Sequence, residues 1–149
     1  MSFDIYLIPL QPIDDFESAM LIFDSLDKGF AAPKFEGDAR LAADVIMQLD
    51  TRYRPFQRNF PEIARYERIS EVEARERHDS VLLNGMTTGG EPMAHFEFHR
   101  DHVVVHWYSG TTPDELDQYI VAICKATGLA AVDPQESSVL RLQADGTLG

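Results

Sequence analysis

Residues 94–107 predict a β-hairpin whose strand register can be read from the pattern of side chains. The segment reads AHFEFHRDHVVVHW, and apolar and polar residues alternate on either side of Arg100 and Asp101. With those two residues at the tip, the expected cross-strand pairs are His99 with His102, Phe98 with Val103, Glu97 with Val104, Phe96 with Val105 and His95 with His106. A shift of one residue would mix apolar and polar side chains on both faces, so the hydrophobic pattern selects this register.

The predicted hairpin has one apolar face and one polar face. The apolar face consists of Ala94, Phe96, Phe98, Val103, Val105 and Trp107. The polar face consists of His95, Glu97, His99, His102 and His106, interrupted only by Val104. We expect the apolar face to pack against the helices that begin near Asp14 and Thr112, and the histidines to face away from them.

Apolar side chains at helical spacing predict two helices in the first third of the chain. The first begins at Asp14, where Asp14 and Glu17 form a start that resembles a capping box, and Gly29 supplies a stop. The second runs from about Asp38 and ends before Pro55, because proline cannot continue a helix.

A third helix has the strongest start in the sequence. Thr112 is a typical N-cap, Pro113 suits the first helical position, and Glu115 follows three residues after the cap. Gly128 is expected to end this helix. Residues 70–78 have a helix-favouring composition and predict a short additional helix, although their apolar face is thin.

Three further strands are predicted, over residues 3–9, 80–83 and 129–132. The first has apolar side chains on both faces, which indicates a central strand. The resulting order is strand, two helices, three strands, helix, strand. This order predicts an α+β fold, with a mostly antiparallel sheet of about five strands and helices packed on one face. A chain of 149 residues is expected to form a single domain over residues 1–149.

The charge balance predicts which partners the protein can bind. With 25 acidic and 13 basic side chains, the formal net charge is −12, which disfavours nucleic acids and anionic membranes and favours a basic protein partner. The alternative interpretation is that the acidic surface serves only to keep the protein in solution. The first ten residues lack the basic start of a signal peptide, and the single Cys124 lies on an apolar helical stripe. These features predict a cytoplasmic protein in which Cys124 has a packing role.

Residues 51–61 form the one stretch in which arginine outnumbers acidic residues. It reads TRYRPFQRNFP, with three arginines interleaved with aromatic side chains. Such a pattern can hold an anion or stack on a base. The alternative interpretation is a long connection whose aromatic side chains lie under the fold.

The histidines suggest a metal site of limited extent. His95 and His99 are roughly 13 Å apart along one strand, at about 3.3 Å per residue, so all four hairpin histidines cannot bind one ion. A cross-strand pair can, and His95 with His106 and Glu97 would supply a ligand set found in catalytic metal sites. His99 and His102 form a second pair. The alternative is that the histidines form a polar strand surface that faces solvent. In that case the surrounding negative charge should favour their protonated forms.

Both ends of the chain resemble a family of small bacterial proteins. The chain begins Met-Ser-Phe-Asp-Ile-Tyr and closes on Gly128-Leu129 followed by Asp133-Pro134-Gln135. The family begins Met-Ser-Tyr-Asp and ends on a similar Asp-Pro-Gln strand; residues 50–80 match it poorly. Some similar small acidic proteins act as immunity proteins that neutralise a toxin. The resemblance therefore implies a binding protein, and it carries over no catalytic residue.

Two functional hypotheses follow from the sequence. The first is a non-enzymatic interaction protein, an immunity-type inhibitor that binds a basic partner and needs no cofactor. Its predicted docking surface is the acidic side of the first helix, formed by Asp14, Asp15, Glu17, Asp24 and Asp27. The second is a metal-binding protein or metal-dependent enzyme that uses His95, Glu97 and His106.

Overall fold

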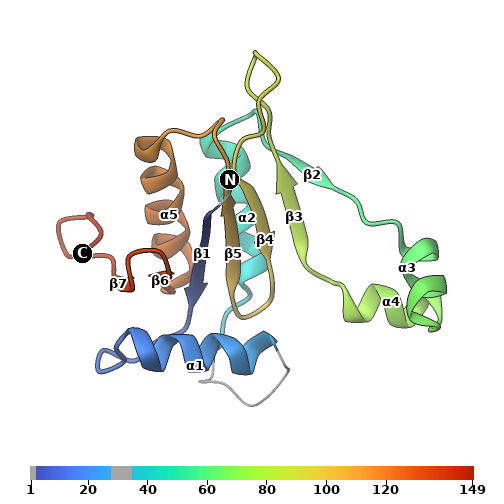
Figure 1. Cartoon of the computed structure of the whole chain (residues 1–149), viewed down its shortest axis with the longest axis horizontal. Helices are drawn as coiled ribbons and strands as arrows, with labels where there is room; N and C mark the ends of the chain where they lie inside the picture. The colour runs from blue at the N-terminus through green and yellow to red at the C-terminus, as the bar shows by residue number, and fades with distance from the viewer. Residues whose placement is uncertain (1–2, 28–34) are drawn as a thin grey trace.

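The computed structural model describes residues 3–27 and 35–149. In this part of the chain, seven strands form one antiparallel sheet in the order β2-β3-β4-β5-β1-β6-β7 (Figure 1). The strands are β1 (Phe3–Ile8), β2 (Arg54–Phe56), β3 (Val81–Asn84), β4 (His95–Phe98), β5 (Val103–Trp107), β6 (Ala130–Asp133) and β7 (Ser138–Leu140). The helices are α1 (Phe16–Asp27), α2 (Ala42–Leu49), α3 (Phe60–Glu67), α4 (Glu71–Arg77) and α5 (Pro113–Thr127), with a 3-10 turn at Ala39–Leu41 before α2.

The predicted α+β class and the antiparallel sheet are confirmed. The sheet has seven strands in place of about five, because the short strands β2 and β7 extend its two edges. β2 pairs with β3, and β7 pairs with β6. Each of the two edge strands has three residues, which is too short for alternation to be detected in the sequence.

The hairpin register predicted from the sequence is confirmed. In the β4–β5 pair, His95 lies opposite His106 and Phe98 opposite Val103, and the His99 amide donates to the His102 carbonyl at 2.9 Å. The prediction that the first strand is central is also confirmed, because β1 lies between β5 and β6.

The main core lies between the apolar face of the sheet and the helices α2 and α5. Phe96, Phe98, Val103 and Val105 are fully buried there. The facing helices contribute buried side chains that include Ala42, Ala43, Ile46, Leu116, Tyr119, Ile120 and Ile123. Trp107 packs against the edge of this core and is only half-buried.

The expected position of the first helix is wrong, because α1 packs against the opposite face of the sheet. There Ala19 is buried with Ile8 and Val132, and Phe23 stacks on Tyr6 with ring centroids 3.9 Å apart. Figure 1 shows α1 crossing the lower end of the sheet, with α2 behind the strands. The cause is a second apolar patch on β1 and β6, which the hairpin pattern does not reveal.

The helix ends follow the sequence closely for α5 and less closely for α1. In α5, Thr112 and Glu115 form a capping box, and Gly128 adopts the left-handed conformation that ends the helix. In α1, the cap is Asp15, whose Oδ1 accepts a hydrogen bond from the Ser18 amide. The predicted cap by Asp14 and Glu17 is therefore one residue early. Gly29, the predicted stop, lies outside the described residues.

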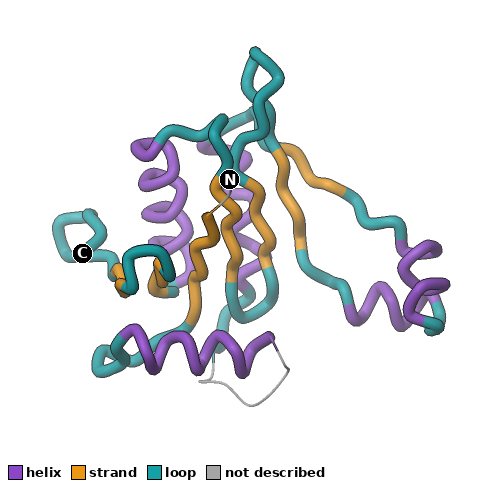
Figure 2. The backbone as a smooth tube through the Cα atoms, viewed as in Figure 1, coloured by secondary structure: helices purple, strands orange, loops and turns teal. Residues whose placement is uncertain are grey.

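Residues 51–80 contain more regular structure than predicted. The short helix expected over residues 70–78 is confirmed as α4, with Ser70 as its cap. The helix α3 was not predicted; Asn59 caps it and Pro61 lies in its first turn. Figure 2 shows α3 and α4 side by side beyond the β2–β3 edge, away from the other helices.

Candidate functional site

His106 on β5 links three neighbouring strands on the polar face of the sheet. Its Nδ1 lies 2.7 Å from Oδ1 of Asp4 on β1, and its Nε2 lies 2.8 Å from Oε2 of Glu97 on β4. Asp4 is the direct cross-strand partner of His106, while Glu97 reaches it diagonally. When the imidazole is protonated, both ring nitrogens donate hydrogen bonds. In its protonated form, His106 is therefore an imidazolium ion hydrogen-bonded to two carboxylates.

These two carboxylates determine the chemistry of the ring. The hydrogen bond to Glu97, with a further contribution from Asp4, raises the pKa of His106 against the opposing effect of burial. The same bond lowers the pKa of Glu97. An imidazolium with both N–H groups engaged has no lone pair, so in this state it neither accepts a proton nor binds a metal. The arrangement suits an electrostatic link between strands.

The remaining hairpin histidines form stacked pairs. The His95 ring lies over His106 with centroids 5.5 Å apart, and its Nδ1 is hydrogen-bonded to Oδ1 of Asn84. The His99 and His102 rings are 4.2 Å apart and nearly parallel. Burial lowers the pKa of His95 and of His99. The expectation that acidic surroundings favour protonation is wrong for these two, because burial outweighs the nearby charge.

The structure brings together only part of the predicted metal site. Glu97 and His106 are hydrogen-bonded to each other, and His95 presents its ring face, not a nitrogen, to His106. Over residues 3–27 and 35–149, no group of three or more His, Cys, Asp or Glu side chains is placed to hold a metal ion. Metal binding stays a prediction, and elemental analysis of protein purified without a histidine tag tests it.

An NMR titration of the histidine rings is expected to separate them by environment. His106 should titrate above its ordinary pKa of 6.5 and His95 and His99 below it. The stabilisation from His106 is complete below pH 6.5 and is lost as the pH rises through its raised pKa. Glu97 contributes above its ordinary pKa of 4.5 and loses its contribution as the pH falls through the lowered value.

The Glu97→Gln variant tests the assigned cause. It should lower the pKa of His106, because it removes the negative charge that faces Nε2. Glu73→Gln, at an exposed position on α4, is the matched control and should leave the pKa of His106 unchanged. A His106 pKa at or below 6.5 in the unmodified protein would contradict the charge assignment.

Two of the five acidic residues predicted to bind a partner accept hydrogen bonds from nearby backbone amides. Oδ2 of Asp14 accepts a hydrogen bond from the Gln11 amide at 2.8 Å, and Oδ1 of Asp15 accepts one from the Ser18 amide at 2.9 Å. The Asp14 carbonyl also accepts a hydrogen bond from the Arg141 guanidinium at 2.9 Å. One oxygen of each carboxylate therefore stabilises the start of α1, while both side chains keep their negative charge.

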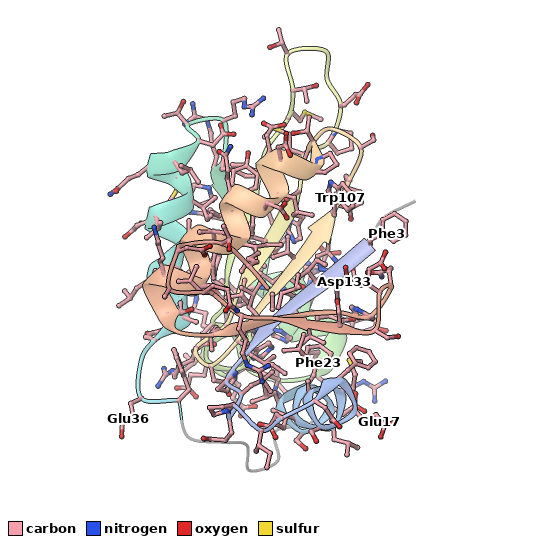
Figure 3. All side chains as sticks on the ribbon, turned by 90° about the vertical axis from the view of Figure 1, so that its left-hand side faces the viewer. Phe3, Glu17, Phe23, Glu36, Trp107 and Asp133 are labelled. Carbon is pink, nitrogen blue, oxygen red and sulfur yellow. The ribbon has the colours of Figure 1, made fainter. Side chains whose placement is uncertain are left out.

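The other predicted residues lie within α1, and two of them flank an exposed leucine. Glu17 and Asp24 are exposed, and neither forms an ion pair with any described residue. Leu21 lies between them at helical spacing and is 70% exposed. We call Glu17, Leu21 and Asp24 the α1 stripe. Figure 3 shows Glu17 on the outer side of α1, whereas Phe23 points toward the sheet. The side chain of Asp27 lies outside the described part of the structure.

The negative charge is concentrated in two stretches of the chain. Residues 1–27 contain six acidic residues and no lysine or arginine, and residues 101–140 contain six acidic residues and one lysine. Residues 28–100, which include α3 and α4, are nearly balanced, with twelve acidic and eleven basic residues. The acidic stretches supply α1, β1, β5, α5, β6 and β7. The charge is therefore asymmetric across the sheet, and its field attracts a cationic surface toward α1 and α5.

The arginine-rich segment 51–61 is held against the fold by ion pairs and by a buried aromatic side chain. Arg52 forms ion pairs with Asp50 at 2.7 Å and Glu115 at 2.8 Å. Tyr53 is buried in the core, which agrees with the interpretation that aromatic side chains lie under the fold. Phe56 departs from it, because this ring is exposed on the edge strand β2.

Two residues of these surfaces were missed by the sequence reasoning. Asp4 contacts His106 only because β1 and β5 are neighbours, and no local pattern reveals that pairing. Leu21 was detectable, because it lies off the spacing of the apolar residues that face the sheet, such as Phe16, Met20 and Phe23. A helical-wheel reading would have placed it on the solvent side.

Comparisons with protein-family models, with curated proteins and with solved structures found no match to this chain. The resemblance of the two chain ends to a small bacterial family stays an expectation. No helix in the described residues is long and apolar enough to cross a membrane.

Proposed function

We propose that this protein binds a basic protein partner through the α1 stripe and acts as an immunity-type inhibitor in the bacterial cytoplasm. The observation that carries the proposal is the stripe itself, an exposed leucine framed by two carboxylates that have no cationic partner within the described residues. An apolar contact with a charged rim is the usual composition of a protein-binding surface. No lysine or arginine occurs in residues 1–27, so α1 itself contributes only negative charge to that rim.

The chemistry of the other candidate groups supports binding over catalysis. His106 is held between two carboxylates and is unsuited to act as a base in that state. Cys124 is buried on α5, and burial raises the pKa of its thiol to about 11, so the thiolate that nucleophilic catalysis needs is disfavoured. An immunity-type role is the form of binding that the resemblance of the chain ends implies.

The test is capture of a partner from the native cell, followed by charge reversal in the stripe. We expect one polypeptide with a basic surface to bind in a fixed stoichiometry, as measured by native mass spectrometry. The double variant Glu17→Lys/Asp24→Lys should raise the dissociation constant of the complex with this partner about tenfold, because two favourable rim charges become repulsive. Leu21→Ala should also weaken binding, because the apolar contact is reduced.

The matched control reverses two charges on α4, which lies beyond the β2–β3 edge of the sheet. Glu73 and Glu76 on α4 are exposed and form no ion pair with a described residue, so Glu73→Lys/Glu76→Lys makes the same change in net charge. This control should bind the partner almost as well as the unmodified protein does. An equal loss in both double variants would show a general charge effect and would contradict a docking surface on α1.

A further inference from the structure

A cavity of about 370 Å³ lies at the end of the sheet where β1 begins and β5 ends. This volume falls within the roughly 300–1,000 Å³ that ligand-binding cavities occupy. Its floor is apolar and is formed by Ile5, Leu116, Ile120 and Leu140, with Phe3 and Trp107 beside them. Figure 3 shows Phe3, Trp107 and Asp133 close together at this end of the sheet.

The two aromatic rings are held in place with part of their surface exposed. Their centroids are 6.0 Å apart with an angle of 46° between the planes. The indole N–H of Trp107 donates to the Thr111 carbonyl at 2.8 Å, which fixes the ring and satisfies its only polar group. Phe3 remains 37% exposed. Phe3 and Trp107 therefore both have accessible surface beside the cavity. The faces of such aromatic rings attract cations.

Three carboxylates line the same cavity, and none of them forms an ion pair with a described residue. They belong to Asp117 on α5 and to Asp133 and Glu136 around the β6–β7 turn. The amides of Gln135 and Glu136 donate to Oδ1 of Asp133, and this orients its carboxylate. No lysine or arginine is among the lining residues. A cation entering the cavity would meet only opposite charge.

We propose that this cavity binds an arginine side chain of a basic partner protein. The guanidinium group is planar and weakly hydrated, stacks on aromatic rings and donates to two carboxylates at once. A lysine ammonium is more strongly hydrated and makes less use of the rings. A larger cavity of about 570 Å³ lies farther along α5 and shares Asp117 with this one, but Lys125 also lines it, which makes it a poorer site for a cation.

The inference relies on the proposed function only for the basic character of the partner. Its site involves β1, β5, α5 and the β6–β7 turn and contains no residue of the α1 stripe. The two proposals therefore fail independently. Loss of partner capture in the stripe variants tests the first, whereas a small arginine probe tests the cavity without any partner.

The experiment uses the fluorescence of Trp107, which is the only tryptophan in the chain. The probe is acetyl-Gly-Arg-Gly-amide, and the matched peptides carry citrulline or lysine in place of arginine. We expect a saturable change in emission with a dissociation constant in the range of about 1–10 mM, which is typical of a weak contact by one side chain. Citrulline, which has nearly the same shape without the charge, should bind at least about tenfold more weakly, and lysine should fall between them.

Two double variants decide whether the cavity carboxylates are responsible. Asp117→Asn/Glu136→Gln should weaken binding of the arginine peptide about tenfold. Glu73→Gln/Glu76→Gln on α4 makes the same change in charge away from the cavity and should leave binding of the peptide unchanged. Circular dichroism verifies that both variants are folded. An equal response to the citrulline peptide, or a response that the cavity variant does not alter, would overturn the inference.

Discussion

Replacing Phe96 with alanine is expected to lower the free energy of unfolding by about 3–5 kcal/mol. Phe96 is fully buried on β4. Its ring contacts those of Tyr53, Phe98 and Tyr119, with centroids 5.1–5.7 Å away. Truncation removes these contacts and leaves a cavity under α5, and both effects destabilise the protein. Urea unfolding followed by circular dichroism gives the free energy directly.

Phe56→Ala is the matched control for this change. Phe56 is also a strand phenylalanine, but it lies on the edge strand β2 and is 54% exposed. Its replacement should change the free energy of unfolding by less than about 1 kcal/mol. Similar losses for the two variants would contradict the assignment of the core to the α2–α5 face of the sheet.

The second large effect is expected at Asp50, which joins the end of α2 to α5. Its carboxylate accepts hydrogen bonds from Arg52 Nη2 and from the Tyr119 hydroxyl, each at 2.7 Å, and its side chain is only 13% exposed. The hydrogen bonds from Arg52, with that from Tyr119, lower the pKa of Asp50 from 3.8 to about 2. Asp50→Asn is expected to cost about 1–2 kcal/mol at pH 7, after allowance for solvent screening of the exposed Arg52.

The stabilisation from the Asp50 carboxylate should depend on pH. A carboxyl group with a lowered pKa stabilises the fold above its ordinary pKa and loses that contribution as the pH falls through the lowered value. The difference between Asp50→Asn and the unmodified protein should therefore narrow between pH 4 and pH 2. Asp44→Asn, on the exposed side of α2, is the control and should show no comparable difference. A constant difference for Asp50→Asn across this range would contradict the ionic origin of the effect.

The features that the sequence predicted well are those encoded by nearby residues. The register of the hairpin follows from alternation over a short segment, and α5 follows from the capping box formed by Thr112 and Glu115. In both cases the local pattern and the tertiary packing favour the same structure. Local reasoning succeeds under that condition.

The features that were missed depend on distant contacts or on very short elements. The helical pattern of α1 shows which side of the helix is apolar, but it does not show which face of the sheet the helix covers. That choice depends on Tyr6, Ile8 and Val132, which come from two strands far apart in the chain. The strands β2 and β7 form because neighbouring strands offer free edges, and three residues are too few to display a period.

The candidate sites were predictable to a similar degree. The approach of Glu97 to His106 follows from the predicted register, whereas the second carboxylate, Asp4, requires knowledge of the sheet order. The acidic character of α1 was predicted, but the hydrogen bonds that Asp14 and Asp15 accept from nearby backbone amides were not. The cavity beside Trp107 combines residues from both ends of the chain, and no local pattern indicates it.

The central claim is that a basic partner docks on the α1 stripe, and the salt dependence of association tests it most directly. Stopped-flow mixing of the partner with the unmodified protein should give an association rate that falls steeply as the ionic strength rises, because salt screens the attraction between opposite charges. Glu17→Lys/Asp24→Lys should associate more slowly and with a flatter salt dependence, while its thermal stability stays nearly unchanged. An association rate that does not depend on salt, or that the double variant leaves unaltered, would contradict docking at α1.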